Sequence, residues 1–253
     1  MIRRIHRERL VRLGGPRALL MQAAHPVAFA GFFASTTQLH DPYPRLQRTA
    51  AVIDTIIFGA RVDADRVTAR VRAVHSRMRG DLTYAAGRFP AGTPWAADDP
   101  ALLLWIIATL AESSLFVYER YVTGLDSSER ELYWSDFKVL GRLFGLAVAD
   151  MPATWPALRD YIRQMVRGDE LYVTPEAREL GIQIVLQPPV PRTARPLLEV
   201  ANFVTVGLLP GRLRRAYGLR WGPVLGLVHW SGAQYTRRLL MPVLPGRLRY
   251  ARA

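Results

Sequence analysis

The stretch DDPALLLWIIATLAESSLFVYERY, residues 98–121, decides the fold class. Asp99 is a strong helix-capping residue and Pro100 suits the first helical position, so a helix is predicted to start there. The run stays apolar to about Val122, too long for a strand and typical of a helix inside a core. Glu112 lies within it, and a buried carboxylate requires a partner, for which an arginine is expected. A structural ion pair and a catalytic role both stay open for Glu112.

Helix-start signals recur along the rest of the chain, whereas strand signals are scarce. The sequence DSSE at 126–129 is a capping box for a helix predicted to reach about Val148. The proline-rich segment 187–196 is a connector, and the apolar segments behind it are predicted to be helices that pack on the core. Further helices are expected from Asp63 to Gly80, after Thr154, and from Thr174 to Gly181. The sequence therefore predicts an all-α protein with a single globular domain.

The composition excludes several classes of site. The 253 residues include no cysteine, which excludes disulfides, cysteine-based zinc sites, iron–sulfur clusters and thiolate-ligated haem. The sequence contains no HExxH motif, no ExxH motif, no GxSxG elbow, no P-loop and no GxGxxG fingerprint. The nitrogen ligands that remain are the histidines at positions 6, 25, 40, 75 and 229. A site built on one histidine and a bulky cofactor is consistent with this composition.

The net charge of +13 is carried almost entirely by arginine, with Lys138 the only lysine. The excess lies at the two ends of the chain, in residues 1–20 and 188–253. Such a charge suits nucleic acid, an anionic membrane surface or an anionic cofactor. No DNA-reading helix pair is recognisable, so no specific nucleic-acid partner is expected.

The uncharged run 18–34 could imitate a signal sequence, because it follows an arginine-rich start. Gln22, His25 and Pro26 interrupt the run, and its length is marginal for a membrane span. We therefore expect a buried helix bent at Pro26.

The helix predicted over residues 63–79 places His75 among apolar residues. Val67, Val71, Val74, His75 and Met78 fall at spacings of three and four and would share one face. One interpretation is a core histidine whose ring is hydrogen-bonded to a backbone carbonyl. The other is an axial ligand of haem iron, since a neutral imidazole on an apolar wall suits iron.

A second group of polar residues follows a turn at Asp41–Pro44. Arg45, Arg48 and Thr49 fall within one helical turn, where two guanidinium groups and a hydroxyl could bind carboxylates or polarise oxygen. An ordinary solvated first turn is the alternative, although such turns favour acids over arginines.

The order of these motifs resembles that of the MpaB/latex-clearing-protein family, the rubber-oxygenase catalytic domains. The resemblance runs from about residue 13 onward, through GGPRALLMQAAHPVAFAG (14–31), PRLQRT (44–49), VRAVHSRMRG (71–80), Tyr84 and the stretch 98–121. It implies a globin-reminiscent helical core that binds haem b and uses dioxygen. We thus divide the chain into a basic N-terminal segment, 1–12, and an oxygenase-like helical domain, 13–253.

The resemblance also implies roles for particular residues. His75 is similar in position to the proximal haem ligand, and Arg45, Arg48 and Thr49 match the arginine, lysine and threonine of the family's distal motif. Arg48 replaces the lysine, and an arginine does not readily lose its proton to become an iron ligand. Ile107 stands where many relatives carry histidine, and no counterpart of the family's distal glutamate is assigned.

The resemblance, together with these residues, implies a haem-dependent oxygenase that acts with dioxygen on an apolar, unsaturated substrate. The catalytic groups would be Arg45, Arg48 and Thr49, with His75, Arg45 and Arg48 binding the cofactor and His75 the iron. Alternatives are a non-catalytic haem- or lipid-binding protein and a peripheral membrane adaptor. A cytoplasmic location is expected, with peripheral contact between the basic ends and an anionic membrane.

Overall fold

The computed structural model describes residues 1–34 and 42–251. The elements are almost all helical, with a single pair of short strands in this part of the chain, which confirms the all-α single-domain prediction. The first half contains α1 (Ile2–His6), α2 (Gly14–Ala23), α3 (Pro26–Ala34), α4 (Tyr43–Phe58), α5 (Arg61–His75), β1 (Arg79–Asp81), β2 (Pro94–Ala96) and α6 (Pro100–Tyr121). The second half contains α7 (Ser127–Leu143), α8 (Trp155–Arg167), α9 (Pro175–Leu186), α10 (Arg195–Leu208), α11 (Gly211–Ala216), α12 (Pro223–Tyr235), α13 (Met241–Val243) and α14 (Gly246–Arg249).

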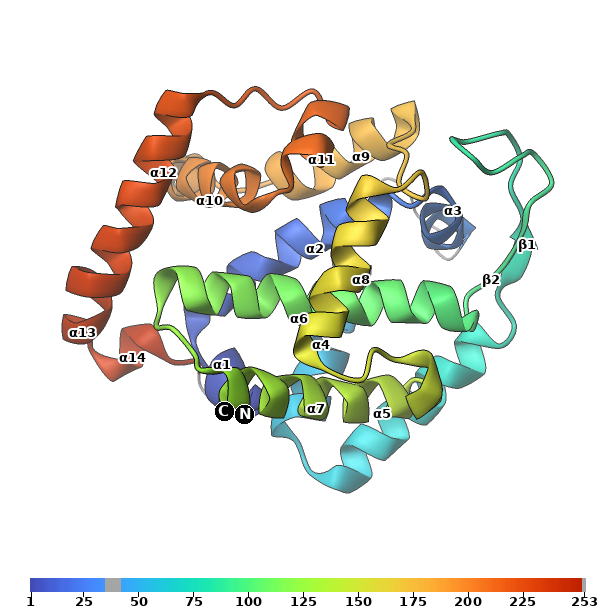
Figure 1. Cartoon of the computed structure of the whole chain (residues 1–253), viewed down its shortest axis with the longest axis horizontal. Helices are drawn as coiled ribbons and strands as arrows, with labels where there is room; N and C mark the ends of the chain where they lie inside the picture. The colour runs from blue at the N-terminus through green and yellow to red at the C-terminus, as the bar shows by residue number, and fades with distance from the viewer. Residues whose placement is uncertain (35–41, 252–253) are drawn as a thin grey trace.

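Helix α6 runs through the middle of the molecule, with α8 crossing in front of it and α2 behind (Figure 1). As predicted, the Asp99 carboxylate caps it, accepting from the backbone N–H groups of Ala101 at 2.8 Å and Leu102 at 3.2 Å. α6 is long and apolar enough to cross a membrane, but 72% of its most apolar window is buried inside the protein. It is therefore the core helix of this fold.

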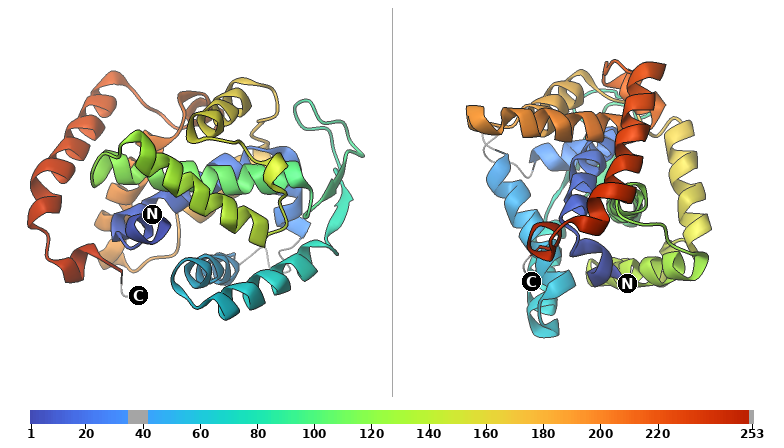
Figure 2. Two further views of the ribbon diagram at one scale, coloured as in Figure 1. Left: turned by 60° about the horizontal axis from the view of Figure 1, so that its bottom comes forward. Right: turned by 90° about the vertical axis from the view of Figure 1, so that its left-hand side faces the viewer.

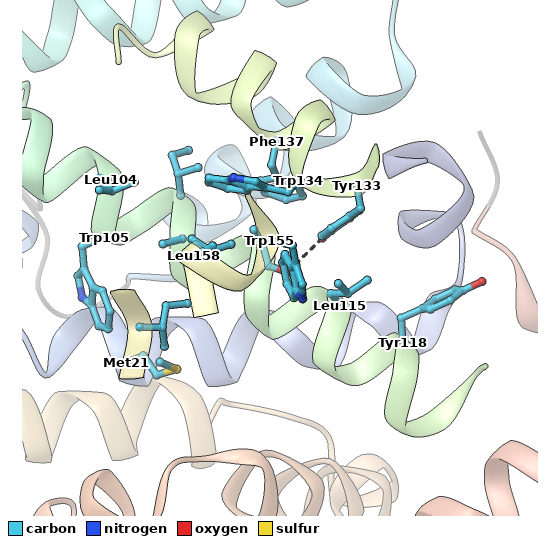
Figure 3. Packing of buried hydrophobic residues seen from close by; sticks show 14 of the residues in the cluster. Met21, Leu104, Trp105, Leu115, Tyr118, Tyr133, Trp134, Phe137, Trp155 and Leu158 are labelled. Carbon is cyan, nitrogen blue, oxygen red and sulfur yellow. Dashed lines mark hydrogen bonds between the residues drawn. The ribbon is translucent and has the colours of Figure 1, made fainter. Parts of the chain in front are cut away.

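Aromatic side chains from three helices fill the main core around α6. Trp105 comes from α6, Tyr133 and Trp134 from α7, and Trp155 from α8 (Figure 3). The Tyr133 hydroxyl donates to the carbonyl of Ala111 at 3.2 Å, which satisfies its polar group inside an apolar cluster. Residues 1–12 contribute Ile5 and Val11 to this same core.

Helices α4 and α5 follow each other in the chain and pack together at one side of the molecule (Figures 1 and 2). Residues of α1 contact α4 and residues of α7 contact α5. Immediately after α5, the antiparallel strands β1 and β2 pair with Gly80 opposite Trp95 and bring the chain to the start of α6. A side chain at position 80 would press on the Trp95 ring, so glycine permits this close pairing.

Several predicted boundaries were wrong. The run 18–34 is two helices rather than one bent helix, because Pro26 starts α3 after the break at Ala24–His25. α5 ends at His75 and Gly80 lies in β1, while α7 ends at Leu143, just before Gly145 with φ 106°. Gly181 lies inside α9 instead of ending it.

Gly14, in the first turn of α2, allows α2 to lie directly against α6. A Cβ atom at position 14 would stand 2.9 Å from the Ser113 carbonyl oxygen, whereas one at Gly15 would meet nothing within 4 Å. We expect Gly14→Ala to lower the free energy of unfolding by about 1–3 kcal/mol, since backbone must move to admit the methyl group. Gly15→Ala, the matched control, should leave stability unchanged or raise it slightly. Equal urea midpoints for the two variants would contradict this packing.

Candidate functional site

His75 is the last residue of α5 and lies on the buried side of that helix. Ala64, Thr68, Val71 and His75 follow one another at spacings of four, three and four, and the first two are buried. Val74 is 52% exposed, so the predicted grouping of Val74 with His75 on one apolar face was wrong. The inward stripe shares Val71 and His75 with the predicted one and continues toward the start of α5 through Thr68 and Ala64.

The His75 ring is half-buried, and no hydrogen bond to it is found among residues 1–34 and 42–251. The backbone-carbonyl partner of a satisfied core histidine is therefore not seen in the described chain. Burial lowers the pKa of His75, the nearby positive charge of Arg45 lowers it further, and Asp98 opposes them. The imidazole is consequently neutral at pH 7, with a nitrogen lone pair able to bind a metal.

Arg45 projects from the first turns of α4 and is partly buried. Its guanidinium lies over the ring of Phe32 in α3, 4.1 Å from the centroid. Burial lowers the pKa of Arg45 to about 10, and the neighbouring charge of Arg48 adds to this effect. The group stays cationic at neutral pH, close enough to His75 to influence its titration. A cation held against an aromatic ring and near a neutral imidazole is suited to bind a carboxylate or polarised oxygen.

Arg48 and Thr49 are placed differently from Arg45. Both are exposed, and the Thr49 hydroxyl donates to the backbone carbonyl of Arg45 at 3.1 Å. The structure thus brings Arg45 and His75 together and leaves Arg48 and Thr49 on the outer side of α4. His40 and Asp41, which belong to the segment before this helix, lie outside the described residues.

An apolar pocket of about 360 Å³ lies between α3 and the hairpin that follows α5. Phe29, Leu82 and Trp95 line it, with Glu176 and Tyr84 at its polar side. Its volume is within the range of small-molecule sites. A larger groove of about 650 Å³ is lined by residues of α9 and of the segment before it. Helix α9 lies away from α4 and α5 (Figure 1). The pocket beside the hairpin is the one adjacent to the chain segment that carries His75.

No group of three or more histidine, aspartate or glutamate side chains in the described chain could hold a metal ion. The other described histidines have partners within the fold. His6 is 3.2 Å from the Tyr133 hydroxyl, and His229 is 2.8 Å from the Tyr121 hydroxyl. His25 accepts from the backbone N–H of Ala28 at 3.4 Å, at the start of α3.

His25 makes folding sensitive to acid. Burial lowers its pKa to about 4, against about 6.5 in the unfolded chain. Stability is therefore complete above pH 6.5 and falls as the pH drops toward 4, because only the unfolded chain takes up the proton. We expect His25→Asn, which keeps an acceptor for Ala28, to lose about 1–2 kcal/mol less stability than the wild type between pH 7 and 5. Urea unfolding at pH 7 and pH 5 measures the loss of stability in each protein. An equal loss in the wild type and in His25→Asn would contradict a neutral buried imidazole.

Glu112 pairs with Arg17 of α2, and both side chains are buried. The same guanidinium donates to the Ser113 hydroxyl at 2.6 Å and to the Leu208 carbonyl at 2.8 Å. The arginine partner expected for Glu112 is thus present. Arg17 was not predicted as this partner, although an arginine within the apolar stretch 14–31 signals a buried cation. Ile107 lies in the main core.

Comparison with known protein families shows which family the chain belongs to. The family model described as "ER-bound oxygenase mpaB/B'/Rubber oxygenase, catalytic domain" matches residues 2–239. The chain belongs to this mpaB/rubber-oxygenase family. The match includes α4, α5 and the pocket beside the hairpin, and it confirms the resemblance seen in the sequence. No characterised protein and no solved structure gives a significant match to the chain.

Proposed function

We propose that this mpaB/rubber-oxygenase family member is a haem b-dependent oxygenase that acts with dioxygen on an apolar, unsaturated substrate. The observation that carries the proposal is the neutral, half-buried His75 imidazole, which has no hydrogen-bond partner in the described chain and lies near the Arg45 cation. A structural core histidine would be expected to have its ring nitrogens satisfied within the protein.

The chemistry of His75 and Arg45 suits a haem group. A neutral imidazole is the commonest protein ligand of haem iron, and an arginine beside it suits the carboxylates of the porphyrin or an oxygen atom that gains charge. When bound, the haem would supply the iron at which dioxygen is activated. His75 would hold the iron, and this role needs no proton transfer because burial keeps the ring neutral.

Arg45 is the residue we assign to polar contact with the cofactor or the reacting oxygen. Its partial burial strengthens such a contact, since charge interactions are stronger where water is excluded. Arg48 adds positive charge close to Arg45. The Thr49 hydroxyl donates to the Arg45 carbonyl within α4, so Thr49 would support the helical turn that carries Arg45. The apolar pocket lined by Phe29, Leu82 and Trp95 would receive the hydrocarbon part of the substrate and exclude water.

The difference in burial between the two arginines gives a test of the proposed chemistry. We expect Arg45→Leu to reduce oxygen consumption by the haem-loaded protein about 100-fold or more, as for loss of one oxyanion donor. Arg48→Leu, the matched control on the exposed side of the same helix, should have a much smaller effect. The assay is oxygen uptake with squalene as an unsaturated apolar probe, together with detection of carbonyl products.

Two outcomes would overturn the proposed activity. Equal activity of the two variants would remove Arg45 from the reaction. A wild-type protein that binds haem stoichiometrically but neither consumes oxygen nor forms product with unsaturated hydrocarbons would be a haem carrier.

A further inference from the structure

Helix α12 carries an unusual surface. Its exposed apolar side chains include Val224 at 73% and Leu227 at 63% exposure. Val224, Val228, Tyr235 and Leu239 follow at spacings of four, seven and four. This spacing places them on one side of α12 and of the π-helical turn, Thr236–Leu240, that continues it. The apolar stripe, as we name this surface, consists of Val224, Leu227, Val228, Trp230, Tyr235 and Leu239, all exposed.

The opposite side of α12 is the one that packs on the protein. His229 and Ala233 are buried, with His229 against the Tyr121 hydroxyl of α6. A side chain at Gly207 of α10 would collide with the His229 ring, so α10 and α12 meet closely. These contacts fix which side of α12 packs on the protein. The apolar stripe therefore faces outward.

Figure 1 shows α12 and α13 along one outer edge of the molecule, and the right-hand view of Figure 2 turns this edge toward the reader. No other helix covers α12 in that view. A contiguous row of large apolar side chains on a surface usually marks a binding face for protein or membrane.

Exposed arginines near the apolar stripe indicate which of these two kinds of partner it binds. Arg220 precedes α12, Arg238 lies in the turn that continues it, and Arg247 lies on α14; all three are exposed. No ion pair to these three is found in the described chain, and no acidic residue follows Glu199 in the sequence. The surface is thus apolar in the middle and positive at its borders.

We propose that the apolar stripe and its bordering arginines dock this protein on an anionic lipid bilayer, with α12 lying in the plane of the interface. Apolar side chains enter the acyl boundary while arginines contact the headgroup phosphates, the pattern of interfacial amphipathic helices. Trp230 and Tyr235 are of the two residue types enriched at this depth. A twofold dimer through the same face would bring the arginines of both copies together, which is unfavourable. The proposal does not depend on haem or on the proposed oxygenase activity.

Flotation of the full chain with vesicles tests the proposal. We expect binding to phosphatidylcholine vesicles that contain phosphatidylserine, and much weaker binding to phosphatidylcholine alone. Leu227→Glu should lower partitioning onto the anionic vesicles about tenfold or more, through lost burial and added repulsion. Leu132→Glu is the matched control, because Leu132 is 58% exposed on α7, away from the stripe. Val224→Glu repeats the test at a second position, and circular dichroism verifies that each variant is folded.

A combined Arg220→Gln, Arg238→Gln and Arg247→Gln variant should lose the preference for anionic vesicles. The proposal is overturned if the wild type does not bind these vesicles, or if Leu227→Glu and Leu132→Glu bind equally. It is also overturned if the wild type sediments as a dimer that Leu227→Glu dissociates, because a second copy would then cover the face. The wild type could also bind polyglutamate as tightly as it binds vesicles, with no effect of Leu227→Glu. That result would show that the surface binds any anion through charge alone, and it would overturn the proposal as well.

Discussion

Glu112→Ala is expected to lower the free energy of unfolding by about 3–5 kcal/mol, because it leaves the Arg17 guanidinium charged and unpaired inside the protein. The side chains of Arg17 and Glu112 are only 4% and 7% exposed, so water cannot replace the lost carboxylate without entering the core. Arg17 would keep its bonds to Ser113 and Leu208, which hold the charge in place and prevent it from swinging to the surface. Equilibrium urea unfolding measures the effect.

Two further variants separate the buried charge from the packing around it. Glu119→Ala removes a partly exposed carboxylate from the same helix, where Glu119 pairs with Arg130 at 2.7 Å. That change should cost about 1 kcal/mol or less, as exposed ion pairs do. The double variant Arg17→Met/Glu112→Leu should recover most of the stability lost in Glu112→Ala, because neither charge then remains buried. A Glu112→Ala variant as stable as Glu119→Ala would show that the pair is not desolvated.

Local signals in the sequence were sufficient for the parts of the fold that depend on local chemistry. The Asp99 cap, Pro100 and the apolar run predicted α6 correctly, and the capping box at Asp126 and Glu129 starts α7 as expected. Helix ends were less predictable. Gly181 has the residue type of a helix end, yet it lies inside α9, where a side chain would press on Leu20 and Tyr217. That requirement comes from tertiary packing and leaves no trace in local spacing.

In the candidate site, too, some features could be predicted from local sequence and others depend on tertiary packing. Spacing placed His75 on the inner side of a helix and Arg45 on the next helix toward the N-terminus, but it could not tell Arg45 from Arg48. The position of Phe32 under the Arg45 guanidinium and the packing of α4 on α5 decide which arginine is partly buried. The segments behind the proline-rich connector were expected to pack on the core, and α12 does so through His229 and Ala233. Its second, outward apolar face was not predicted, because apolar composition alone does not distinguish a core face from a surface that binds a partner.

His75→Ala is expected to abolish specific haem binding. Changes to residues behind a metal ligand typically cost 10- to 100-fold in metal affinity, so loss of the ligand itself should cost more than about 100-fold. Burial keeps the His75 ring neutral, so no proton would have to leave the ring before iron binds at pH 7. Added imidazole should restore the spectrum of the bound haem in the variant, because it can occupy the space left by the side chain. A purely structural role for His75 would not allow this rescue.

The most direct test of the account is a visible absorption titration with haem on the wild type, His75→Ala and His6→Gln in parallel. His6 is a control because its ring already contacts the Tyr133 hydroxyl on α7. We predict a stoichiometric haem spectrum for the wild type and His6→Gln, and for His75→Ala a spectrum that is lost and that imidazole restores. Absence of binding in the wild type, or the same spectrum in all three proteins, would contradict the assignment of His75 as the haem ligand.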